Sequence, residues 1–142
     1  MNGVETSVNG GLGAGSGGAP IQSYRGLDAW REAMDLAQCL YEVTSTLPAD
    51  ERFGLAQQLK RAAVSIPSNI AEGHARGATK DFCRFLSIAR GSVAEVETQI
   101  ELAVRIGLLQ PAAVESVVQR CDKLGRILRG LRKSLDGKLA KT

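Results

Sequence analysis

The sequence predicts an all-α fold, an antiparallel up-down four-helix bundle, and three observations support this. Apolar residues recur at steps of three and four along four segments, which is the spacing of one buried helix face. The connections between these segments are short, and helices joined by short connections pack antiparallel. No segment alternates apolar and polar residues convincingly with the period of two that marks a strand. The length of 142 residues suffices for one domain with a core.

The first helix is predicted over residues 27–47, where Asp28 can cap its start. Leu47 precedes Pro48, and a residue before proline avoids helical geometry, so the helix is expected to end there. The residues predicted to share its apolar face are Trp30, Ala33, Met34, Ala37, Leu40, Tyr41 and Thr44.

The second helix is predicted to begin near Asp50 and to break in the segment 73–78, which contains Gly73 and Gly77. Its predicted apolar face consists of Leu55, Leu59, Ala62, Ala63, Ile66 and Ile70.

A proline lies inside this second helix, and Pro67 is predicted to kink it. Proline has no amide hydrogen, and its ring clashes with the carbonyl of the residue four positions earlier. The predicted kink group is Ser65, Pro67, Ser68 and Asn69. The favoured interpretation is structural, with a bent helix following a curved neighbour. Two alternatives stay open: the kink directs Ser68, Asn69 and Glu72 toward a partner, or a new helix begins near Ser65.

The third helix is predicted over residues 79–106, about 40 Å long, with Gly107 as its stop. The fourth is predicted to begin at Pro111, since proline fits the first helical turn, and to fray from Gly137. These boundaries divide the chain into a flexible Gly/Ser-rich tail (1–23), a bundle domain (24–136) and a frayed C-terminal end (137–142).

The third helix carries more apolar residues than one core-facing stripe needs. A helix that is apolar over most of its circumference is usually buried on two sides. Either contact between subunits or a central place within one bundle would bury the second side. The residues predicted to form an oligomer interface are Phe85, Ile88, Leu102 and Ile106.

Positive charge is concentrated in the last segment. The chain has a net charge of +3, whereas residues 111–142 contain eight Lys and Arg against three Asp and Glu. Such an excess suits phosphate contacts that are sensitive to salt and tolerant of sequence, although a solvated helix surface would look similar. The predicted nucleic-acid-binding residues are Arg61, Arg76, Lys80, Arg84, Lys123, Arg126, Arg129 and Lys133.

Catalytic, metal and cofactor sites are not predicted. His74 is the only histidine, the segment GHARGATK lacks the spacing of a phosphate loop, and no Glu-x-x-His pair occurs. The three cysteines, Cys39, Cys83 and Cys121, are far apart, which favours reduced thiols and a cytoplasmic location. We therefore expect no enzyme activity, no small-molecule substrate, no secretion signal and no membrane segment.

Two long motifs resemble a known family. The segment AAVSIPSNIAEG (62–73) and the segment FCRFLSIARGSVAEVET (82–98) are similar to the four-helix-bundle proteins encoded within intervening sequences of bacterial 23S ribosomal RNA genes. WREAMDL (30–36) and RFGLAQQLKR (52–61) also match, so the resemblance covers about residues 24–135. It implies a four-helix bundle without established enzymatic activity.

The resemblance also implies an assembly. A related accessory protein of diversity-generating retroelements forms a pentameric barrel, binds nucleic acid through a basic surface and works beside a reverse transcriptase. Our first hypothesis is a non-enzymatic protein that self-associates, with a pentamer favoured, and binds the backbone of RNA or DNA. The alternative is a scaffold that docks a protein partner, such as a reverse transcriptase, without touching nucleic acid.

Overall fold

The computed structural model describes residues 23–141, and the only regular secondary structure over that range is helical. Four long helices follow one another in the chain: α2 (Asp28–Thr44), α3 (Leu55–Ala75), α4 (Thr79–Arg105) and α5 (Pro111–Ala140). Two short 3-10 turns, Tyr24–Gly26 and Ala49–Glu51, precede α2 and α3. The prediction of an all-α fold with four helices is thus confirmed for the described range, while the predicted tail, except Ser23, lies outside it.

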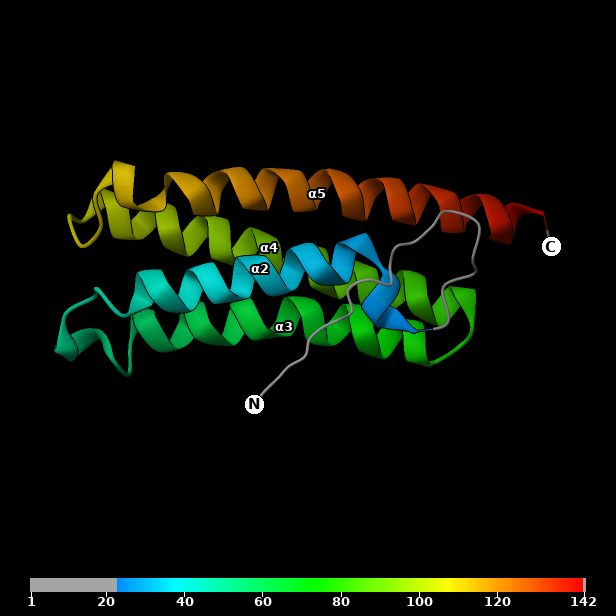
Figure 1. Cartoon of the computed structure of the whole chain (residues 1–142), viewed down its shortest axis with the longest axis horizontal. Coiled ribbons are helices and arrows are strands. Elements are labelled where there is room, and N and C mark those ends of the chain that lie inside the picture. Colours follow the sequence, from blue (N-terminus) through cyan, green and yellow to red (C-terminus); the bar gives the residue numbers. More distant parts are fainter. Residues whose placement is uncertain (1–22, 142) are drawn as a thin grey trace.

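The four helices lie side by side along the long axis of the molecule, and each runs back along the one before it (Figure 1). The helix α3 packs against α2 and α4, and α5 packs against α4 and α2. Contact is most extensive between α3 and α4 and smaller between α4 and α5. One end of the molecule therefore holds the α3–α4 turn with the C-terminus of α5, and the opposite end holds the α4–α5 turn (Figure 1).

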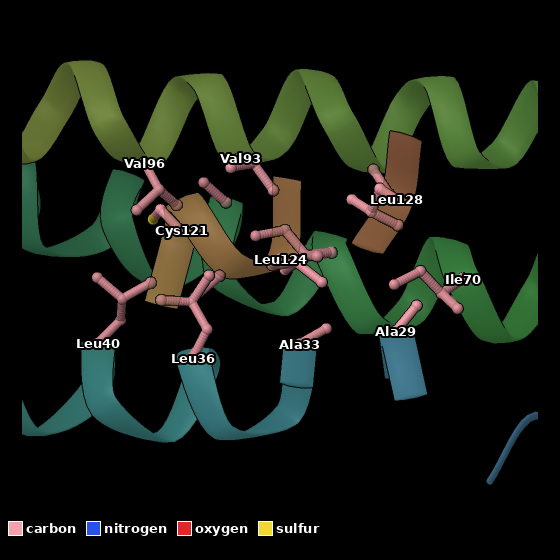
Figure 2. Close-up of a cluster of buried hydrophobic side chains, with 14 of the residues drawn as sticks. Ala29, Ala33, Leu36, Leu40, Ile70, Val93, Val96, Cys121, Leu124 and Leu128 are labelled. Carbon is pink, nitrogen blue, oxygen red and sulfur yellow. The ribbon is translucent and has the colours of Figure 1, made fainter. Parts of the chain in front are cut away.

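The core lies between all four helices. Ala33, Leu36 and Leu40 from α2 point toward side chains of α4 and α5, and Ile70 joins them from α3 (Figure 2). The predicted face of the first helix was partly wrong, because Met34 and Tyr41 are exposed whereas Leu36 is fully buried. A continuous stripe at steps of three and four also fits the row Ala29, Ala33, Leu36, Leu40 and Thr44, which is the buried one.

Several predicted boundaries need correction. The helix α2 begins after Leu27, with no side-chain cap, and Asp28 instead pairs with Arg31 in the first turn. The helix α3 begins at Leu55 rather than near Asp50, whose segment forms a 3-10 turn. At the other end, α5 continues through Gly137 to Ala140, so the predicted fraying there is not seen.

The second helix ends inside the predicted segment 73–78, at Ala75, but α3 passes through Gly73, which is buried. A Cβ at this position would lie 2.6 Å from Phe85 Cβ and 3.1 Å from Phe82 Cδ1. Glycine is therefore needed here because α4 leaves no room for a Cβ, not because the chain turns. The turn glycine is Gly77, whose φ of +85° is a conformation that side chains disfavour. Gly107, with φ of +81°, follows the end of α4 as predicted.

The polar residues around Pro67 bond within the contact of α3 and α4. Ser65 Oγ lies 2.8 Å from Ser92 Oγ, and Asn69 Nδ2 donates to Ser65 O at 2.7 Å and to Ser65 Oγ at 2.9 Å. Because Ser92 is buried, this cluster provides hydrogen-bond partners inside the seam. The helix α3 is continuous through Pro67, so no new helix starts near Ser65. A bend at Pro67 stays a prediction, and Ser68 is exposed.

Candidate nucleic-acid interface

Charge is unevenly distributed along the long axis. We define the basic half as residues 23–36, 65–92 and 126–141, which surround the α3–α4 turn, and the acidic half as residues 37–64 and 93–125. The basic half contains twelve Lys and Arg against six Asp and Glu, and the acidic half contains six against eight. The arrangement of the helices thus gathers charges from separate parts of the sequence at one end (Figure 1), which strengthens the field there.

The predicted basic residues of α5 fall into two groups. Lys123 Nζ lies 3.0 Å from Glu32 Oε2 on α2, and Arg126 pairs with Asp122 one turn earlier. Arg129 and Lys133 are exposed, and the described part of the chain gives neither an ion-pair partner. Of the four predicted residues on α5, these two therefore have the most charge available for a phosphate.

Two of the three predicted basic residues at the α3–α4 turn contact the same aromatic ring, that of Phe85. The guanidinium carbons of Arg76 and Arg84 lie 5.1 and 4.6 Å from the centroid of the Phe85 ring, within the range of a cation–π interaction. Arg76 also pairs with Glu72 at 3.0 Å, while its side chain remains half exposed. Lys80, in the first turn of α4, is exposed. The turn thus presents three cations, two of them held in position.

Arg61 does not join this group. It lies on α3, fifteen residues before Arg76, the residue that follows the end of that helix. This places it about 22 Å away along the axis and in the acidic half. Six of the eight predicted residues therefore lie in the basic half, whereas Arg61 and Lys123 lie in the acidic half.

Two arginines that the sequence analysis did not select lie on the seam between α4 and α5. Arg132 donates to Cys83 O at 3.3 Å and Ser87 Oγ at 2.7 Å, and its Nε lies 3.1 Å from Asp136 Oδ1. The hydrogen bond with Asp136 raises the pKa of Arg132 above its ordinary value. Arg90 and Arg129 both line a hollow between the two helices. These contacts join residues on two different helices, which meet only in the folded chain. The spacing of residues within either helix therefore could not have predicted them.

The predicted oligomer residues divide in two. Phe85 is buried within its own chain, between the arginines of the turn and Gly73, so it belongs to the core rather than to an exposed face. Ile88, Leu102 and Ile106 are exposed, at 42%, 48% and 58%. Leu102 and Ile106 are one helical turn apart and form a small exposed apolar pair, whereas Ile88 lies fourteen residues earlier on α4.

The other residues that could bind a metal or react chemically do not form a cluster in the described part of the chain. His74 packs edge-on against Phe82, with ring centroids 5.6 Å apart. Within residues 23–141, no three His, Cys, Asp or Glu side chains gather as metal ligands would. Cys39, Cys83 and Cys121 are free thiols. Over the same range, no helix has the length and apolar content needed to span a bilayer.

These observations define a class: a small protein that is helical in its described part, with an excess of cationic side chains in the half that holds the α3–α4 turn. The model of the family described as 23S rRNA-intervening sequence protein matches residues 25–130, and the chain belongs to that family. A solved structure of a protein with unknown function from the S23 ribosomal protein family of Bacteroides thetaiotaomicron is similar, with 23% identity and a TM-score of 0.69. The match covers 74% of this chain and 98% of that one, and it supports the fold. A search of curated proteins found no match.

Proposed function

We propose that this chain is a non-enzymatic, self-associating four-helix-bundle protein that binds the backbone of RNA or DNA through its basic half. The observation that carries the proposal is the excess of cationic side chains in the basic half, twelve Lys and Arg against six Asp and Glu. Lys and Arg side chains neutralise phosphates without reading bases. The aromatic residues of this half contact other side chains: Phe85 is buried, and Tyr24 and Trp30 pack edge-on. Stacking on unpaired bases therefore has little support.

Reversing the charge of two available cations is expected to weaken nucleic-acid binding. The Arg129→Glu/Lys133→Glu variant should bind a 30-base-pair RNA or DNA duplex at least tenfold more weakly at about 50 mM salt, because each lost phosphate contact also lowers the gain from counterion release. Filter binding over a salt series measures both the affinity and its salt slope, which should become shallower in the variant.

The matched control is Arg52→Glu/Lys60→Glu, which makes the same charge change in the acidic half and should retain nearly all the affinity. Equal losses of affinity in both double variants would show that binding responds only to net charge and would refute the proposed interface. Absence of binding by the wild-type chain at low salt would refute it as well.

Self-association is proposed to use the exposed aliphatic residues of α4, with a pentamer as the assembly that the family resemblance favours. Native mass spectrometry is expected to show a particle of five chains of 15.1 kDa each. The Leu102→Glu/Ile106→Glu variant is expected to dissociate into single chains, because a carboxylate buried in a contact is costly. A wild-type particle of one chain would contradict this part of the proposal. The three free thiols suit the cytoplasm, the location we propose.

A further inference from the structure

An apolar groove lies between α4 and α5 in the acidic half, near the turn that joins them. It encloses about 770 Å³, a volume within the range of binding sites. Ile100, Val114, Val117 and Cys121 form its floor and are almost completely buried. Val118, at its edge, is 54% exposed. The groove therefore offers a nonpolar surface that part of another molecule could cover.

The floor is nonpolar despite its sulfur atom. Burial, with smaller contributions from Glu97 and Cys39, raises the pKa of the Cys121 thiol to about 12. The thiol is therefore uncharged at neutral pH and behaves as a small hydrophobic group.

Apart from Glu115, the α5 residues that line the groove have short side chains. Ala112, Val114 and Val118 line the α5 side, and α4 contacts α5 less extensively than it contacts α3. No described side chain fills the space between them.

Acidic residues surround this nonpolar floor. Glu97, Glu101 and Glu115 line the groove and are exposed. Glu101 pairs with Arg105 at 2.6 Å, whereas Glu97 and Glu115 have no ion pair among residues 23–141. A ligand that covers the floor must therefore match a negative rim.

We propose that this groove docks an amphipathic, Lys- or Arg-rich helix of a protein partner. Apolar residues on one face of such a helix would cover the floor, and flanking cations would meet Glu97 and Glu115. The site is separate from the proposed nucleic-acid interface, because it lies in the acidic half and its rim carries the opposite charge.

Two other occupants fit the groove less well. Residues 1–22 of this chain contain Glu5 and no Lys or Arg, so they do not complement the rim. A second copy would offer α5 as its most basic helix, yet the apolar residues of that helix, among them Leu124 and Leu128, are buried in its own core. A separate partner helix can bring both the apolar face and the cations.

The test uses a designed peptide as the probe. A fluorescent 18-residue peptide of Leu and Lys, with Leu at helical steps of three and four, is titrated against the full chain by fluorescence anisotropy. A peptide of the same composition, scrambled to remove the helical pattern, serves as the comparison. The patterned peptide should bind at least tenfold more tightly than the scrambled one.

Variants locate the binding. Val118→Arg should weaken peptide binding at least tenfold, because it puts a cation at the edge of the floor. Val64→Arg is the matched control, since Val64 is a similarly exposed valine on α3, at 46%, and it should bind as the wild type does. Glu97→Gln/Glu115→Gln should weaken binding severalfold and reduce its dependence on salt. Circular dichroism on each variant shows that the helices are retained.

Three results would overturn the proposal: equal binding of both peptides, equal binding by the Val118 and Val64 variants, or a fall in native particle mass caused by Val118→Arg. The last result would show that a second copy occupies the groove. Duplex binding measured on the same Val118→Arg protein should remain unchanged, so failure of the groove and failure of the nucleic-acid interface are distinguishable.

Discussion

Replacing Gly73 with alanine is expected to lower the free energy of unfolding by about 1–3 kcal/mol, the usual cost of overpacking a core. The new Cβ would lie 2.6 Å from Phe85 Cβ, closer than two nonbonded carbons can approach. The helices α3 and α4 would have to separate, and their contact is the most extensive in the fold. Urea denaturation followed by circular dichroism measures the change.

Gly91→Ala is the control for this substitution. Gly91 lies in the middle of α4, and a Cβ there would meet nothing within 4 Å. Alanine is the better helix former, so this variant should gain about 0.5–1 kcal/mol of stability. If both variants were stabilised alike, the close approach of α3 and α4 at Gly73 would be wrong.

The second large effect is expected at Leu36. Truncation to alanine should cost about 2–5 kcal/mol, because Leu36 is fully buried among α2, α4 and α5 (Figure 2) and the vacated space cannot fully collapse. Met34→Ala should change stability by less than about 0.5 kcal/mol, since Met34 is 44% exposed. Thermal and urea denaturation of the two variants measure both changes.

Comparing the stability losses of the Leu36 and Met34 variants also tests which face of α2 is buried, the observed one or the one predicted from the sequence. The predicted face contained Met34 and omitted Leu36, so a larger loss at Met34 than at Leu36 would favour the predicted face over the observed one.

The sequence was sufficient to predict the helices themselves, because periodic apolar residues, Gly107 and Pro111 act locally. It was insufficient for Gly73, where the reason for glycine is a neighbouring helix rather than the backbone of α3. The same cause explains the error on Phe85: an apolar residue beside the main stripe of α4 has the same pattern whether it meets a subunit or its own chain. Position along one helix does not reveal what packs against it.

The sequence could predict individual basic residues of the candidate interface but not which residues lie next to one another in it. The excess of Lys and Arg after residue 111 pointed to α5, and Arg129 and Lys133 remain available in the structure. The pairing of Lys123 with Glu32 joins residues far apart in the sequence and could not be seen in it. Nor could the placement of Arg90 beside Arg129 across two helices.

The separation of charge along the axis makes the molecule an electric dipole. The field of a polyanion would orient the elongated molecule before contact, with the basic half facing the polyanion. The thirty residues of α5 extend over about 45 Å, so the negative pole would then point away from the phosphates. A chain oriented in this way would hold anything bound near its far end at a fixed distance from the nucleic acid.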